Sequence, residues 1–181
     1  MAKWLIVYAS VTGNTKKIAE AIHSGFEMGE ADIYPITDNG KFKLDDYENI
    51  AVGYWLTRGG PDKMVQALLA KLHGKQVVLF QTHGTEIGSE HCFTAFARAA
   101  TYLPSDNLVL ATFTCQGKIN PALLAKRFNG DKNDPHTATE RNKARWASAA
   151  AHPNDEDLQR AKDFVGVIKH KLALRQKYLN K

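Results

Sequence analysis

Residues 3–15 read KWLIVYASVTGNT and join an apolar segment to a polar turn. The apolar part, Lys3 to Ala9, has the length of a strand and is nearly continuous, which is typical of a strand covered on both faces. The polar part, Ser10 to Thr15, packs three hydroxyls, a glycine and an amide into six residues. Asn14 to Glu27 then repeats apolar residues at helical spacing. The stretch predicts a buried strand, a turn and an amphipathic helix.

The same alternation of short apolar segments and amphipathic segments continues along the chain. Such a β-α-β-α pattern predicts a parallel sheet with helices on both faces, and right-handed crossovers make that sheet doubly wound. We therefore predict an α/β fold with three layers. The further strands are expected at residues 31–35, 49–54, 76–81 and 107–114, and further helices at 61–72 and 89–102.

The pattern changes after the fifth expected strand. Residues 129–133 predict a polar loop, residues 139–151 a short alanine-rich helix, and residues 155–178 a long helix with an acidic first turn and a basic last one. We expect a main domain over residues 1–128. Residues 129–181 are then a C-terminal extension, a loop plus two helices, packed on the same domain.

Composition predicts a cytoplasmic globular protein. Apolar residues make up 44% and charged residues 24% of the 181 residues, and no signal-peptide pattern or membrane span is visible. Cys92 and Cys115 are expected to be free thiols. Cys115, beside Lys118, has two interpretations: a packed cysteine at a strand end, which we favour, or a thiol with a lowered pKa.

The net charge of +5 has an uneven distribution. Residues 1–130 carry 13 Lys/Arg and 12 Asp/Glu, whereas the last sixteen residues carry five Lys/Arg and no acid. Cations near the carboxyl end of a helix suit its dipole, so we favour a solvated helix end. A basic end can also meet nucleic acid, an anionic membrane or an acidic partner. We predict no nucleic acid partner.

The turn over residues 10–15 has the composition of an anion site. Backbone N–H groups at a helix start have no helical partner, and the helix dipole favours negative charge there. Gly13 lets the backbone curve closely around a ligand. The turn contains no acid, and it lacks both the nucleoside-triphosphate and the dinucleotide glycine motifs. It therefore suits a monophosphate, the alternative being hydroxyls that only cap the helix.

At these residues the sequence resembles the flavodoxin family, whose first strand ends in a Ser/Thr-x-Thr-Gly-x-Thr loop that holds the phosphate of FMN. Residues 10–15 match this pattern completely, and the likeness covers about residues 3–128 in the short-chain form. The resemblance implies a flavodoxin-like sheet of five parallel strands in the order 2-1-3-4-5. FMN would then lie at the switch point beyond strands 1 and 3.

The resemblance also implies which loops contact the flavin. Trp55 is the aromatic candidate to pack on the ring, and Gly59 is the glycine whose peptide changes orientation on reduction. Ser89 and His91 stand where the family usually has a stacking tyrosine, and Arg58 would raise the redox potential. The implied FMN contacts are Ser10, Val11, Thr12, Gly13, Asn14, Thr15, Tyr54, Trp55, Leu56, Thr57, Arg58, Gly59, Thr82, His83, Gly84, Thr85, Ser89 and His91.

The function implied is that of an FMN-binding electron-transfer protein that shuttles electrons between a reductase and an electron acceptor. We assign no general acid or base, and the scattered histidines predict no metal site. One alternative is an FMN-dependent oxidoreductase that acts directly on a planar substrate, a quinone or a tetrapyrrole. Another is a flavin-free binding module on the same scaffold. The sequence favours the carrier.

Overall fold

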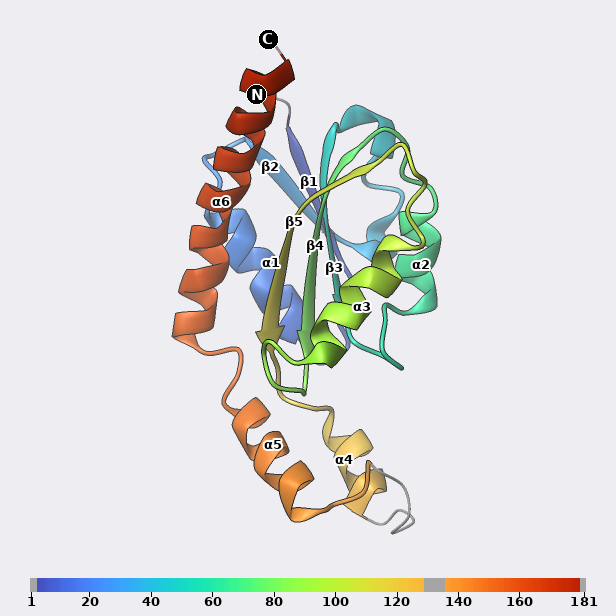
Figure 1. The fold of residues 1–181 in the computed structure, drawn as a ribbon, viewed down its shortest axis with the longest axis vertical. Coiled ribbons are helices and arrows are strands. Elements are labelled where there is room, and N and C mark those ends of the chain that lie inside the picture. Colours follow the sequence, from blue (N-terminus) through green and yellow to red (C-terminus); the bar gives the residue numbers. More distant parts are fainter. Residues whose placement is uncertain (1–2, 129–135, 180–181) are drawn as a thin grey trace.

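The computed structural model describes residues 3–128 and 136–179. Its centre is a sheet of five parallel strands in the order β2-β1-β3-β4-β5, with helices on both faces (Figure 1). The predicted doubly wound α/β fold and strand order are confirmed. The strands are β1 (Trp4–Tyr8), β2 (Ala31–Pro35), β3 (Asn49–Trp55), β4 (Gln76–His83) and β5 (Leu108–Gln116).

Alternate residues of the central strands feed two separate hydrophobic clusters. Helices α1 (Asn14–Ser24) and α6 (Asp155–Leu179) cover one face, where Ile6 and Phe80 lie. Helices α2 (Lys63–Leu69) and α3 (Glu90–Ala100) cover the other, where Leu5 and Leu79 lie. Because side chains of a strand alternate between faces, a continuous apolar run is required to fill both clusters.

Helix α6 is an integral part of the first cluster. Phe164 packs on Phe113 of β5 with ring centroids 5.2 Å apart, and Ile168 is completely buried. A Cβ added at Gly25 would lie 2.5 Å from the carbonyl oxygen of Lys162, so α6 approaches the end of α1 very closely. Neither α6 nor any other helix in the described part of the chain is long and apolar enough to cross a membrane.

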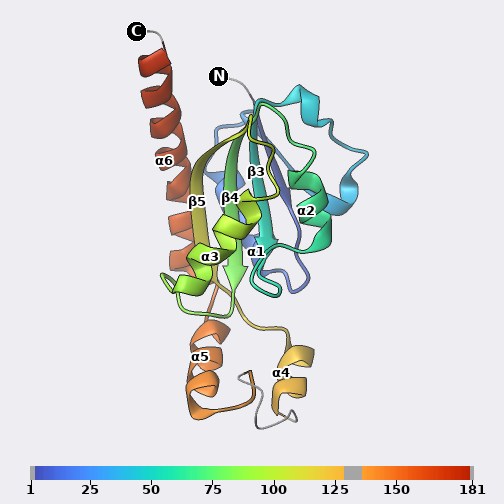
Figure 2. The ribbon, with the colours of Figure 1, turned by 45° about the vertical axis from the view of Figure 1, so that its right-hand side comes forward.

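Two short helices lie outside the layered body. Helices α4 (Pro121–Phe128) and α5 (Glu140–Ala150) follow β5 and project beyond the carboxyl ends of the strands (Figures 1 and 2). The sequence predicted α5 but missed α4, which buries none of its residues and so shows no core-facing stripe. The predicted loop at residues 129–133 lies outside the described residues.

Several element ends differ from the predicted ones. Helix α2 starts after Asp62, whose side chain accepts a hydrogen bond from the N–H of Met64 at 2.8 Å, and it is shorter than the predicted 61–72. Strands β4 and β5 each extend two residues further than predicted. Two 3-10 turns, Ile36–Asp38 and Leu44–Asp46, complete the described elements.

Candidate functional site

The loops that follow four strands meet at the carboxyl edge of the sheet, as a parallel sheet requires. Hydrogen bonds join them. The Oγ1 atoms of Thr15 and Thr82 lie 2.8 Å apart, and Asn14 donates from Nδ2 to the carbonyl of Lys118 at 2.8 Å. The N–H of Leu56 donates to the carbonyl of Thr82 at 2.9 Å. The loops comprise residues 9–13, 56–62, 84–89 and 117–120.

The turn between β1 and α1 leaves donors unused. Gly13 adopts a left-handed conformation with φ 88°, no side chain caps α1, and its first turn contains no acid. The main-chain bonds of the helix begin where the N–H of Lys17 donates to the carbonyl of Gly13 at 3.0 Å. The Ser10 Oγ is buried and has no hydrogen-bond partner among the described residues, while Thr12 is exposed. A buried hydroxyl without a partner is costly unless a ligand supplies one.

The other two polar side chains of the turn are engaged with neighbouring strands. A pair of hydroxyls uses one of its two hydrogens, so the Thr15–Thr82 pair keeps a second hydrogen to donate elsewhere. Asn14 lies against Gly117, where an added Cβ would come 2.6 Å from Nδ2. The turn can therefore hold an oxyanion through uncharged donors from Ser10, Thr12, Thr15 and the free N–H groups of α1.

The end of β3 carries two aromatic residues in different settings. Tyr54 is completely buried in the second cluster, and burial raises its pKa above the usual range. The Tyr54 ring therefore lies in the core and cannot stack on a ligand at the carboxyl edge of the sheet. Trp55 is half-buried, pairs in register with Thr82 of β4, and packs against the same cluster. Trp55 is the aromatic residue of β3 that remains partly open at this edge.

Residues 57–60 form a tight turn after β3. Thr57 and Gly60 exchange main-chain hydrogen bonds of 2.9 and 3.1 Å, and Arg58 and Gly59 have φ of 51° and 79°. Positive φ at both central residues is the signature of a type I′ turn. Arg98 of α3 donates from Nη1 to the carbonyls of Arg58 and Gly59 at 3.3 Å each. A Cβ at Gly59 would displace that Nη1, and the positive φ of 79° favours glycine at this position.

The loop after β4 brings a histidine to the same turn. His91 is exposed in the first turn of α3, and its Cε1 lies 3.7 Å from the position of a Cβ built on Gly59. Ser89 precedes α3 and its Oγ lies 3.2 Å from the Sγ of Cys92. Residues 84–91 therefore supply a histidine beside the turn at residues 57–60, and they contain no Phe, Tyr or Trp.

His83 is directed into the protein rather than toward the turn at residues 10–15. Its Nδ1 lies 3.0 Å from the carbonyl of Thr85, which can only accept, so Nδ1 carries the proton. Its Nε2 lies 2.6 Å from the hydroxyl of Thr114 and accepts from it. Burial lowers the pKa of His83 to about 4 and keeps the ring neutral. Beside it, Gly84 allows a close approach of Ile119, whose Cγ1 would clash with an added Cβ.

The edge carries charges of both signs: exposed acids lie in the loop after β4 (Glu86) and at the start of α3 (Glu90), and cations come from three elements. Arg58 is exposed, Arg98 reaches the turn from α3, and Lys118 is exposed after β5. Asp62 uses its carboxylate to cap the start of α2. Cys115 is completely buried and its pKa is raised by burial to about 12, so the packed interpretation of this thiol is confirmed.

Sequence reasoning missed Arg98. Arg98 lies on a helix forty residues from the turn that it contacts, and no local pattern links the two. Gly117 and Lys118 directly follow β5; the sequence placed them at the end of the fifth expected strand, but no FMN contact was assigned to them. The expected site residues otherwise gather at one edge, with the rings of Tyr54 and His83 turned inward.

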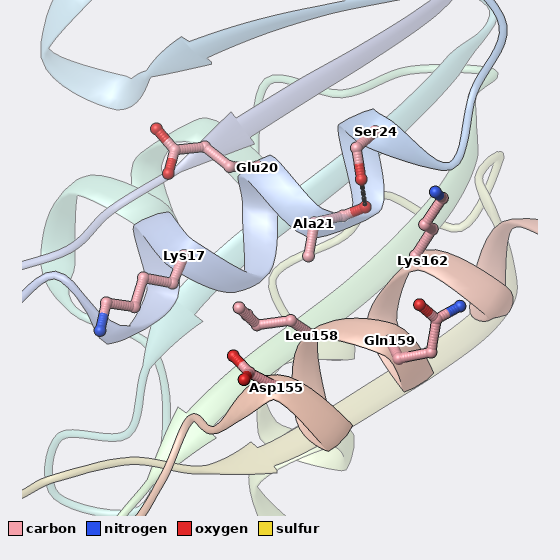
Figure 3. A pocket seen from close by; sticks show the side chains of 8 residues that line it. All are labelled: Lys17, Glu20, Ala21, Ser24, Asp155, Leu158, Gln159 and Lys162. Atoms are coloured by element: carbon pink, nitrogen blue, oxygen red, sulfur yellow. Dashed lines mark hydrogen bonds between the residues drawn. The ribbon is translucent and has the colours of Figure 1, made fainter.

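A separate surface groove lies between the two helices on one face of the sheet. It has a volume of about 360 Å³ and is lined by α1 and the first turns of α6, where Leu158 faces Ala21 (Figure 3). Lysines and acids both line it. It is formed by the helical layer and not by the loops of the carboxyl edge.

Sequence comparison finds relatives for most of the chain. A family described as "Flavodoxin domain" matches residues 5–166. A flavodoxin-like domain-containing protein BilS from Clostridioides difficile (strain CD3) is 31% identical over 166 residues, which cover 90% of this chain and 94% of that protein.

Solved structures share the fold. Oxidised flavodoxin 2 from Bacillus cereus superposes with a TM-score of 0.52 at 19% identity, covering 94% of this chain and 99% of that chain. A flavoprotein from Lactobacillus acidophilus NCFM, solved in complex with FMN, gives a TM-score of 0.50 at 18% identity over 63% of this chain and 93% of that chain. At these identities the likeness concerns the fold.

Proposed function

The chain belongs to the flavodoxin domain family, and we propose that it binds FMN and shuttles electrons between two redox partner proteins, a reductase and an acceptor. The observation that carries the proposal is the uncapped start of α1, next to the buried, unpartnered hydroxyl of Ser10. The FMN complex of the Lactobacillus acidophilus flavoprotein, which has the same fold, supports the choice of cofactor.

In this proposal the turn at residues 10–15 holds the phosphate. Ser10, Thr12 and Thr15 donate from their hydroxyls, and the first N–H groups of α1 add further donors. The left-handed Gly13 lets the chain turn tightly between the strand and the helix. Residues 10–15 contain no cation, so within the turn the helix dipole and the number of donors provide the stabilisation.

The remaining loops hold the ring. Trp55 offers an aromatic face at the end of β3, and residues 57–60 present carbonyls whose positions Arg98 fixes. The bound flavin supplies the electron chemistry, while the protein supplies position and electrostatics. His83, neutral and buried, fixes the end of β4 to β5.

The positive groups of the edge favour added negative charge on a bound cofactor. Arg58 and Arg98 lie at one turn. About 1.4 kcal/mol of differential stabilisation corresponds to roughly 59 mV for one electron. A partly exposed charge pair at an effective dielectric constant of about 20 supplies that amount. We therefore propose a redox potential raised relative to a site with an acidic rim.

Replacing Thr12 with Asp tests the phosphate anchor. A carboxylate would face the phosphate dianion, and FMN should bind at least roughly a hundredfold more weakly. Riboflavin, which has no phosphate, should be much less affected. Flavin fluorescence quenching on titration of the apoprotein measures both. Ser105→Asp introduces the same charge at an exposed residue before β5, at the opposite edge of the sheet, and should leave both affinities unchanged.

Two results would contradict the proposal. If Thr12→Asp binds FMN as tightly as the unaltered protein, the phosphate anchor lies elsewhere. If the unaltered protein ignores added FMN and stays colourless, the flavin-free binding module is the correct description.

The loop after β4 supports a second candidate function. Because residues 84–91 provide His91 and no stacking hydrocarbon ring, one face of the flavin is left open to a planar substrate such as a quinone or a tetrapyrrole. A direct oxidoreductase would then turn over NAD(P)H and such a substrate without a partner protein. Steady-state assays with the purified holoprotein distinguish this enzyme from a carrier, which shows no turnover alone.

A further inference from the structure

Helices α4 and α5, which project beyond the sheet, form the α4–α5 hairpin. Its exposed residues have no role in the site described above, and we call them the hairpin surface. We propose that it is the docking surface for an acidic redox protein that exchanges electrons with the flavin; this inference rests on the function proposed above. The surface consists of the exposed residues Lys118, Leu123, Lys126, Phe128, Arg141 and Lys143.

The hairpin surface begins at the candidate site itself. Asn14, the first residue of α1, donates to the carbonyl of Lys118 at 2.8 Å. The N–H of Lys118 in turn donates to the carbonyl of His152 at 2.9 Å, which joins the outgoing and returning segments of the hairpin. Figures 1 and 2 show α4 and α5 beyond the same carboxyl edge where the loops meet. A protein that docks on this surface is therefore brought to the flavin site.

Side-chain packing holds the two helices together. Trp146 of α5 is only 5% exposed, and its ring meets that of Phe128 of α4 edge-on with centroids 5.4 Å apart. Ala149 is completely buried, and Thr139 caps α5 by accepting from the N–H of Asn142 at 3.2 Å. The surface thus belongs to a packed unit and not to a single unsupported helix.

The charge of this segment is opposite to that of the preceding chain. Residues 117–152 contain seven Lys/Arg and three Asp/Glu, whereas residues 1–116 contain ten Lys/Arg and twelve Asp/Glu. Lys126 and Arg141 are exposed and have no carboxylate partner among the described residues. Lys143 pairs with Glu140 at 2.8 Å. A positive surface steers an acidic partner toward it and aligns the encounter.

The other basic region, on α6, is partly occupied by structural contacts. Lys169 pairs with Glu30 at 2.6 Å, and Lys171 donates to the carbonyl of Leu110 at 3.0 Å. The end of α6 also lies at the opposite end of the molecule from the hairpin (Figure 1). Of these two basic regions, the hairpin surface is therefore the one that lies on the side of the candidate site.

Exposed apolar side chains lie among these cations. Leu123 is 42% and Phe128 57% exposed. Exposed apolar side chains together with charged ones are the composition of a transient interface, the size class used by electron-transfer proteins. A nucleic acid is less suited, because its backbone is bound through cation–phosphate contacts and offers no partner for these exposed apolar side chains. The observations therefore favour an acidic protein.

The test uses the full chain, loaded with FMN, and a purified plant-type [2Fe–2S] ferredoxin as the acidic probe. Backbone amide shifts in ¹⁵N-labelled protein locate the contact even for weak binding. We expect shifts at α4 and α5 at low salt and their disappearance at high salt. The variant Lys126→Glu with Arg141→Glu should bind about tenfold more weakly at low salt, because rim charges govern steered association.

A matched control reverses the same number of charges elsewhere. Lys71→Glu with Lys177→Glu alters exposed residues after α2 and near the end of α6, and should leave ferredoxin binding unchanged. Shifts that map to α6, equal losses in the two variants, or no binding at low salt would overturn the docking surface. Tight, salt-dependent binding of duplex DNA without binding of ferredoxin would assign the surface to nucleic acid instead.

The same samples separate this inference from the proposed function. FMN binding is followed independently by flavin fluorescence. A protein that takes up FMN but shows no response on α4 and α5 contradicts the docking surface alone. A protein that holds ferredoxin on α4 and α5 but takes up no FMN contradicts the proposed electron carrier and keeps the hairpin surface as an acidic-protein site.

Discussion

Helix α6 and the α4–α5 hairpin follow one another in the last third of the chain, yet they differ in how they are held. Helix α6 buries Phe164 and Ile168 in the same cluster as β5. The hairpin buries few apolar side chains, chiefly Trp146 and Ala149, and leaves Leu123 and Phe128 exposed. Helix α6 is thus part of the hydrophobic core on one face of the sheet, whereas the α4–α5 hairpin is a mostly exposed extension next to the candidate site.

The difference teaches where function can be added to this fold. An element that fills the core cannot change its residues without cost, because core packing is dense. An element that projects from the carboxyl edge can change its charge and shape freely while staying next to the ligand loops. The predicted boundary after residue 128 stays a prediction, and the packing of α6 shows that the long C-terminal helix supports the sheet.

Truncating one phenylalanine in each region gives the largest expected contrast. Phe164→Ala removes a ring packed between α6 and β5 and should lower the free energy of unfolding by about 3–5 kcal/mol. Phe128→Ala, in the hairpin, should lower it by less than about 1 kcal/mol, since its ring is 57% exposed. Urea denaturation measures both. Equal losses of unfolding free energy in the two variants would contradict the conclusion that α6 belongs to the core and the α4–α5 hairpin does not.

The pH dependence of stability is the second test, and it concerns first His83, which is buried at the end of β4. Its pKa is about 4 in the folded protein, below the usual value of about 6.5, so folding favours the neutral ring. The contribution of the neutral His83 ring to the free energy of unfolding is complete above pH 6.5. It is lost as the pH falls toward 4, by roughly 3 kcal/mol in total.

His83→Gln should remove most of this slope between pH 6.5 and 4. Denaturation curves across that range, for the variant and the unaltered protein, check the result. An unchanged slope in the variant would show that His83 titrates normally and is not held neutral by the core.

Asp157 joins the two regions and should give a smaller effect. It is 3% exposed at the start of α6 and accepts hydrogen bonds from His152, at the end of the hairpin, and from the N–H of Asn154. Burial alone would raise its pKa, but these hydrogen bonds outweigh burial and lower it. Asp157→Asn should cost about 1–3 kcal/mol at pH 7.

The stabilisation by Asp157 is also lost as the pH falls, but at a lower pH than that of His83. Since the folded pKa lies below the ordinary value of about 3.9, its contribution is present above that pH and disappears as the pH falls through the folded pKa. Asp157→Asn and the unaltered protein should therefore converge in acid. Asp163→Asn, on the exposed side of α6, is the control. Curves that stay parallel down to low pH would remove Asp157 from this role.

The sequence predicted the layered fold well, because each buried strand is a nearly continuous apolar run. Strand β2 has the predicted bounds, and β1 and β3 agree within a residue or two. The ends of β4 were harder to predict. Gln81, Thr82 and His83 are polar and suggest a loop, but they are buried, and their side chains form hydrogen bonds with the Cys92 carbonyl of α3, with α1 and with β5.

The candidate site was predictable only in part. The turn at residues 10–15 is local, so its composition sufficed to indicate an anion site. The inward direction of the Tyr54 and His83 rings depends on neighbours distant in sequence. The contact of Arg98 with the turn at residues 57–60 likewise requires α3 to be placed. Helix α4 is short and buries none of its residues.

The phosphorus NMR spectrum of FMN added to the protein tests the central claim most directly. If the turn after β1 grips the phosphate, the resonance of bound FMN should be displaced from that of free FMN. It should also stay constant across the pH range around 6 in which a free phosphate monoester titrates, because the dianion is held by donors and the helix dipole. A resonance that keeps the free position and titrates normally would show that the phosphate is in solvent, and it would contradict this account of the turn.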